Sequence, residues 1–124
     1  MSDELSRLPP NVQERLLRLQ QLQQTLQSIL AQKQQVEMEK SEVEQTIAEL
    51  QKTVETAVIY KAVGSLLVKA EKPKVTEELV ERKELLETRS TVLARQEERM
   101  RSQIKESQTK LQEDLNPVNQ PPTS

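Results

Sequence analysis

The side chains of this chain that could take part in chemistry are carboxylates, ammonium groups and guanidinium groups. The sequence contains no cysteine and no histidine, which excludes disulfides, thiolate metal sites, cysteine nucleophiles and the commonest general base. Adjacent carboxylates occur at Glu77-Glu78 and Glu97-Glu98, and such pairs are typical of solvated helix faces. No glycine-rich phosphate loop and no nucleophile–base pair is present. The sequence therefore predicts neither an enzyme nor a cofactor or metal site.

The composition favours an elongated helical protein over a globular one. Of 124 residues, 34% are hydrophobic and Tyr60 is the single aromatic residue, so a large globular core is not expected. The net charge of −2 and the regular periodicity described below argue against disorder. We expect a single domain over residues 1–124, mainly α with one β-hairpin, built as a long coiled coil.

The charges exclude several classes of partner. The 18 basic and 20 acidic residues are interspersed, which leaves no basic stripe for nucleic acid and no polybasic run for a membrane surface. No apolar run approaches the length of a membrane span, and the first residues carry no signal-peptide pattern. The sequence predicts a cytoplasmic protein that binds neither nucleic acid nor membrane.

A heptad pattern runs through the first half of the chain and predicts a coiled-coil helix over residues 8–56. Steps of three and four residues from Val12 meet an apolar residue at most positions. Arg15, Lys33 and Lys40 interrupt the pattern, but their stems can lie on the seam while their charges reach water. The apolar positions are Val12, Leu19, Leu22, Leu26, Ile29, Val36, Val43, Ile47, Leu50, Val54 and Ala57.

A second, sparser pattern predicts another helix over residues 75–116. Leu79, Leu86, Leu93 and Met100 recur every seven residues, and the phase then shifts to Ile104 and Leu111. The run from Thr76 to Leu79 predicts a helix start, and Asn116-Pro117 predicts a helix end. We expect the tail, residues 117–124, to be disordered.

The two patterns match when the helices are paired antiparallel. Facing residues in such a pair have a nearly constant sum of residue numbers, and the layers below keep that sum constant to within one. The layers are Val54/Val75, Leu50/Leu79, Val43/Leu86, Val36/Leu93, Leu30/Met100, Leu26/Ile104 and Leu19/Leu111. The sequence therefore predicts an antiparallel intramolecular coiled coil.

Polar layers weaken this coiled coil and leave two interpretations of its open end. Ile47 faces Arg82, and Lys40 faces Arg89, in the predicted register. Leu16 and Leu17 cannot both lie in the seam. Apolar side chains at the open end are either exposed or packed in the last heptad.

The segment 57–72 predicts a β-hairpin between the helices. Strand-forming residues run from Val58 to Val63 and from Ser65 to Ala70, and Gly64, the only glycine, suits the turn. Both strands have apolar residues on both faces, which is typical of a multichain sheet or barrel. The alternative is a loop folded onto its own coiled coil. Because a lone hairpin is marginal and exposes two edges, we expect an oligomer.

The hairpin also carries a family pattern. An aromatic residue and a lysine (Tyr60-Lys61) precede an apolar residue and glycine (Val63-Gly64), and an aliphatic run closed by lysine follows (Leu66-Leu67-Val68-Lys69). With Pro9-Pro10 and the Gln/Leu-rich first arm, this pattern resembles the beta class of the prefoldin family, archaeal and eukaryotic co-chaperones, over roughly residues 8–116. The single hairpin favours the beta class over the alpha class.

The resemblance implies a function and an assembly. Members form a hexamer of two alpha-class and four beta-class subunits, whose hairpins join into an intersubunit β-barrel. The coiled-coil tips hold non-native client proteins and pass them to a group II chaperonin without ATP. Carried over, the client contacts are Val12, Leu16, Leu17, Leu19, Leu111 and Leu115, and the assembly contacts are Ile59, Tyr60, Val63, Gly64, Leu66, Leu67 and Val68.

Two other functions remain open on the sequence alone. A coiled-coil structural adaptor would bind one specific folded partner and would not protect unrelated unfolded proteins. A nucleic-acid-binding helical arm is the third, and the balanced charge argues against it.

Overall fold

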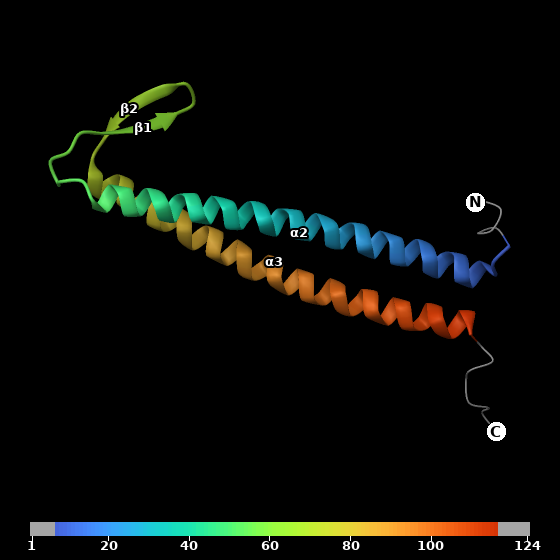
Figure 1. Cartoon of the computed structure of the whole chain (residues 1–124). Coiled ribbons are helices and arrows are strands. Elements are labelled where there is room, and N and C mark those ends of the chain that lie inside the picture. Colours follow the sequence, from blue (N-terminus) through green and yellow to red (C-terminus); the bar gives the residue numbers. More distant parts are fainter. Residues whose placement is uncertain (1–6, 117–124) are drawn as a thin grey trace. The chain divides into compact units, whose positions relative to one another are not determined.

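The structure is a computed structural model that describes residues 7–116. Its elements follow in the order α2 (Pro10–Gln51), β1 (Ile59–Val63), β2 (Leu66–Ala70) and α3 (Lys72–Leu115) (Figure 1). Two long antiparallel helices joined by a two-stranded hairpin are therefore confirmed. The chain divides into two compact units, one with residues up to 31 and from 94 on, the other with residues 32–93. We call them unit 1 and unit 2.

Helix α2 ends earlier than the heptad pattern predicts, at Gln51 and not at residue 56. The backbone N–H groups of Lys52 and Thr53 bond to carbonyls three residues back, and the Thr53 hydroxyl donates to the Leu50 carbonyl at 2.6 Å. These bonds satisfy carbonyls that the next helical turn would otherwise use. Val54 then lies outside the helix with 68% of its surface exposed, so the predicted Val54/Val75 layer is wrong.

Helix α3 begins earlier than predicted, at Lys72 and not at residue 75. Pro73 occupies its first turn, where a missing N–H costs no helical bond. The N–H of Val75 already bonds to the Glu71 carbonyl at 3.0 Å. Thr76, the predicted start, donates its hydroxyl to the Lys72 carbonyl at 2.8 Å and lies within the helix, so that start is wrong.

The core of unit 2 consists of four seam residues. Val36 and Leu50 of α2 and Leu86 and Leu93 of α3 are buried, as the predicted layers require. Each buried aliphatic side chain of this size contributes about 1.5–3 kcal/mol. Polar contacts join the helices beside this core: Ser90 to Glu37 at 2.7 Å, Arg82 to Glu39 at 3.1 Å and Lys83 to Glu44 at 3.9 Å.

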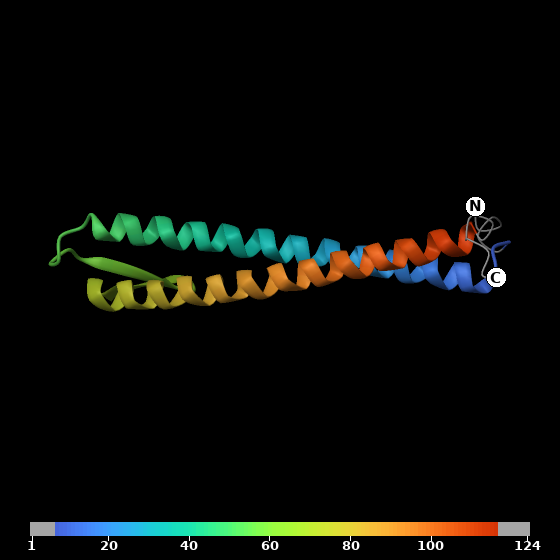
Figure 2. The ribbon, with the colours of Figure 1, turned by 90° about the horizontal axis from the view of Figure 1, so that it is seen from below.

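The core of unit 1 also consists of predicted seam residues. Leu22 and Ile29 of α2 and Ile104 of α3 are buried, while Leu26 and Met100 are half-buried. Arg15 of α2 forms an ion pair with Asp114 of α3, which joins the two helices near the open end. Within each unit the two helices run in opposite directions, as the perpendicular view of Figure 2 also shows.

The hairpin closes through a two-residue turn. Val63 pairs with Leu66 at the end of the antiparallel ladder, so Gly64 and Ser65 form the turn. Gly64 has φ 59° and is the one residue with positive φ in the described part of the chain. A positive φ at the first central position alone is the pattern of a type II′ turn. The predicted hairpin with Gly64 at its turn is confirmed.

Candidate functional site

The hairpin of unit 2 presents apolar side chains on both faces. Its register places Ile59, Lys61, Val63, Leu66, Val68 and Ala70 on one face and Tyr60, Ala62, Leu67 and Lys69 on the other. Leu67 is 72% exposed, and Tyr60, Val63, Leu66 and Val68 are exposed as well. The structure thus brings the predicted assembly residues together on ten contiguous ladder positions and their turn. Their role in assembly stays a prediction.

The first face of the hairpin looks onto α3 across a groove. Val63, Val68 and Ala70 of the hairpin and Val75 of α3 are among the residues that line a hollow of about 680 Å³. No other strand pairs with β1 or β2 among residues 7–116, so each strand leaves one row of backbone groups without a ladder partner. Such edges are templates for pairing with another chain.

An ion pair holds the hairpin to α3. The Lys61 ammonium on β1 donates to the Glu78 carboxylate on α3 at 2.6 Å, and both side chains are roughly half exposed. This hydrogen bond is the main reason that the pKa of Glu78 lies below its usual value. Desolvation, the next largest effect, opposes this lowering of the pKa, and the charges of Lys61 and Lys74 lower the pKa further. The carboxylate is therefore ionised, and the contact intact, at neutral pH.

A lysine connects the end of α2 to the start of α3. Lys72 donates to the Thr53 carbonyl at 2.7 Å and lies 3.5 Å from the Glu55 carboxylate, with only 12% of its side chain exposed. The last turn of α2 contains no basic residue, so Lys72 supplies the cation that a helix C-terminus favours. This contact joins the segment that follows α2 to the first turn of α3.

At the open end, in unit 1, the predicted client residues fall into two groups. Val12 is only 2% exposed and so packs in the seam, while Leu16, Leu19 and Leu111 are half-buried. Leu17 and Leu115 are 60% and 50% exposed. Both interpretations of the open end therefore hold, for different residues. As client contacts, all of these residues stay predictions.

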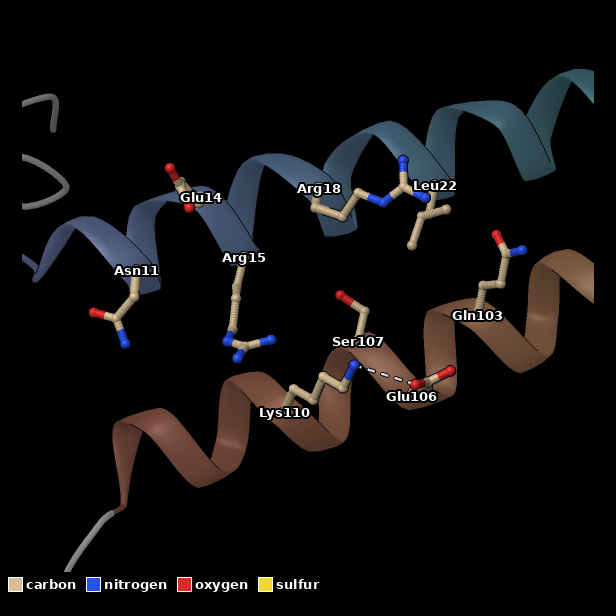
Figure 3. A pocket seen from close by; sticks show the side chains of 9 residues that line it. All are labelled: Asn11, Glu14, Arg15, Arg18, Leu22, Gln103, Glu106, Ser107 and Lys110. Carbon is tan, nitrogen blue, oxygen red and sulfur yellow. Dashed lines mark ion pairs between the residues drawn. The ribbon is translucent and has the colours of Figure 1, made fainter.

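Two hollows flank this open end. One, of about 400 Å³, is lined by Leu16, Leu17, Leu19, Gln13, Gln20 and Gln23 of α2. The other, of about 520 Å³, lies between α2 and α3 and is lined by Asn11, Glu14, Arg15, Arg18, Leu22, Gln103, Glu106, Ser107 and Lys110. Figure 3 shows Asn11 and Arg15 extending from α2 toward α3, and Lys110 paired with Glu106 at 3.2 Å. The first hollow is apolar and the second is charged.

The described residues offer no catalytic or metal-binding arrangement. No group of His, Cys, Asp and Glu within residues 7–116 is placed to hold a metal ion. Neither helix in this part of the chain carries an apolar stretch that would span a lipid bilayer. Exposed apolar side chains gather on the hairpin and at the open end of the described chain.

Sequence reasoning missed three features of these surfaces. The Lys72 contact with Thr53 has no sequence signal beyond a lysine placed before Pro73. The Arg15–Asp114 pair was available from the antiparallel register, because the two positions face each other in it. The carboxamides of Gln20 and Gln23 lie one turn from Leu16 and Leu19, and helical spacing places them beside these leucines.

Comparison with known proteins gives consistent matches. A family model described as "Prefoldin subunit" matches residues 13–117. A prefoldin subunit beta of Archaeoglobus fulgidus is 47% identical over 113 residues, which cover 91% of this chain and 97% of that protein. A prefoldin subunit beta of Thermococcus onnurineus is 42% identical over 114 residues, covering 92% and 98%. The crystal structure of the prefoldin beta subunit from Thermococcus strain KS-1 matches with a TM-score of 0.79 and 37% identity, covering 94% of this chain and 98% of that chain.

Proposed function

Because the chain belongs to the prefoldin family as a beta subunit, we propose that it is one of four beta subunits that join two alpha-class subunits in a hetero-hexamer. Prefoldin subunits are non-enzymatic chaperone components. The proposed hexamer captures non-native proteins in the cytoplasm without ATP and delivers them to a group II chaperonin.

The observation that carries the assembly is the exposed hairpin. Two apolar faces and two unpaired edges on one short sheet are unfavourable in water, and neighbouring hairpins in an intersubunit β-barrel would cover both. The assembly contacts are Ile59, Tyr60, Val63, Gly64, Leu66, Leu67 and Val68. Among them Gly64 acts through its backbone, by closing the turn with φ 59°.

Client capture falls to the coiled-coil tip, which we define as residues 12–19 and 111–115 of unit 1. The exposed side chains of Leu17 and Leu115 and the half-buried Leu16, Leu19 and Leu111 offer small apolar patches to unfolded chains. Val12 is buried, so it supports the packing beneath these patches and meets a client only when the helix ends separate. Small patches without a deep pocket suit partners that lack a fixed structure.

Native mass spectrometry of the protein gently isolated from its source tests the proposal. We expect a mass of four copies of this chain with two copies of a longer, two-hairpin subunit. A monomer or dimer of this chain, or a complex with one folded partner, would contradict the hexamer and favour a structural adaptor. Adding a denatured model client should then shift the hexamer to a client-bound mass.

A further inference from the structure

The glutamines of the first half of α2 have no part in the proposed function. Two of them, Gln20 and Gln23, line the hollow of about 400 Å³ beside Leu16, Leu17 and Leu19. Helical spacing explains this neighbourhood, because residues three and four positions apart share a face. We call this site the glutamine-rimmed hollow.

The lining of the glutamine-rimmed hollow is neutral. Among the described residues, its walls are three leucines and three glutamines, and none of them is ionisable. Gln13 already donates its side-chain amide to the Leu8 carbonyl at 2.7 Å. Gln20 and Gln23 are exposed, and they line the hollow together with the leucines.

We propose that the glutamine-rimmed hollow binds an extended, uncharged segment of a non-native polypeptide by its backbone as well as by its side chains. Leu16, Leu17 and Leu19 contact aliphatic side chains of the client, and the carboxamides of Gln20 and Gln23 hydrogen-bond its backbone amides. The inference rests on the proposed function, since it names which feature of a client is recognised at the tip and by the two glutamines that follow it on α2.

The chemistry of the carboxamide favours this occupant. A glutamine side chain offers both a carbonyl acceptor and an NH₂ donor, so it can pair with a backbone N–H or C=O in either chain direction. A folded protein satisfies nearly all of its backbone groups internally, whereas an unfolded segment presents them. Carboxamides next to leucines therefore respond to the two features that unfolded segments share, apolar side chains and unpaired backbone.

The neutral lining separates this site from its neighbour. The charged hollow between α2 and α3 in Figure 3 is lined by Arg15, Arg18 and Glu106, among others. The described residues that line the glutamine-rimmed hollow offer no charge for a client to match. Binding there should change little between low and high salt, because screening acts on charges.

The test compares two labelled peptides by fluorescence anisotropy with the full-length chain. Both alternate leucine and serine, and one has its backbone N–H groups replaced by N-methyl. We expect the wild type to bind the methylated peptide roughly tenfold more weakly, as about one to two lost hydrogen bonds imply. In Gln20→Met/Gln23→Met, which keeps length and helix propensity, we expect this difference to fall below about twofold.

The control is Gln21→Met/Gln24→Met, which makes the same chemical change at two positions that do not line the hollow. We expect it to discriminate between the peptides as the wild type does. If Gln20→Met/Gln23→Met still discriminates tenfold, or the wild type never does, the backbone inference is overturned while the proposed function stands.

A second variant distinguishes a result that contradicts only the inference from one that contradicts the proposed function. Leu16→Ser/Leu17→Ser should lose both peptides together, because it removes the apolar contacts. If this variant binds both peptides as the wild type does, the tip does not capture clients, and the inference is overturned as well. A chain that begins at residue 7 and binds both peptides more tightly would assign the hollow to the protein's own first residues, which also overturns the inference.

Discussion

Gly64 shows how one residue controls the hairpin. Its φ of 59° lies in the left-handed region, and a Cβ built there meets no atom within 4 Å. Gly64→Ala should therefore cost backbone strain alone, roughly 1–2 kcal/mol. We expect hairpin amide hydrogens to exchange about tenfold faster, measured by hydrogen–deuterium exchange. Gly64→Asn is the matched control, since asparagine tolerates this region better; equal effects of both substitutions would contradict a strain mechanism.

The Lys61–Glu78 pair gives the hairpin a dependence on pH. A carboxylate with a lower pKa in the folded state stabilises its contact at pH values above its unfolded pKa, and this contribution is lost as the pH falls through the folded pKa. The pKa of Glu78 is lowered chiefly by the Lys61 hydrogen bond. The contact is therefore fully present at neutral pH and lost in acid.

Lys61→Met removes the main cause of that shift. We expect the pKa of Glu78 to rise toward its ordinary value, followed by NMR titration of the side-chain carboxyl carbon. Lys74→Met is the control, because Lys74 acts on Glu78 only through its charge and should raise the pKa less. An unchanged pKa in Lys61→Met would mean that the ion pair does not form in solution.

At the scale of elements, Lys72 links the end of α2 to the first turn of α3. Its ammonium is 2.7 Å from the Thr53 carbonyl and is mostly buried. Lys72→Met should lower the free energy of unfolding by about 1.5–3 kcal/mol, the contribution of a hydrogen bond to a charged group. Urea unfolding followed by circular dichroism measures this loss. Lys74→Met, on the exposed side of the same turn, should change stability by less than about 0.5 kcal/mol.

The helices were predictable from the heptad pattern of the seam. Their ends were not, because hydrogen bonds of individual side chains determine them. The heptad pattern predicts both helices and their direction, and burial of Val36, Leu50, Leu86 and Leu93 follows from it. The predicted end of α2 and start of α3 were wrong because the Thr53 hydroxyl and the Lys72 ammonium donate hydrogen bonds to carbonyls near the end of α2. The heptad pattern carries no information about such bonds. The glutamine-rimmed hollow was not predicted for a related reason, since its glutamines lie outside the seam.

The same reasoning limits what the sequence says of the tip. Leu16 and Leu17 are adjacent, and an adjacent pair cannot both enter one seam, so exposure of one was predictable. Which one is exposed depends on the phase of the helix at its first turns. The structure exposes Leu17 and leaves Leu16 half-buried.

At the scale of the whole molecule, the proposed function separates assembly from capture. The hairpin residues lie in unit 2 and the tip residues in unit 1, so substitutions in one should leave the packing of the other intact. A single apolar patch binds weakly, and several tethered patches on one hexamer raise the effective concentration of each. Capture should therefore need both intact tips and an intact assembly.

Leu17→Ser/Leu115→Ser and Leu67→Ser test this separation, because all three leucines are at least half exposed and each substitution should cost little stability. The tip variant should keep the oligomeric mass of the wild type and lose suppression of client aggregation, measured by light scattering of a denatured protein on dilution. The hairpin variant should lose the oligomer, and with it the avidity, which is about 10²–10⁴-fold for linked sites, while each chain still binds a labelled peptide.

A tip variant that suppresses aggregation as well as the wild type would show that these leucines do not capture the client. A tip variant that dissociates would show instead that they hold the assembly together.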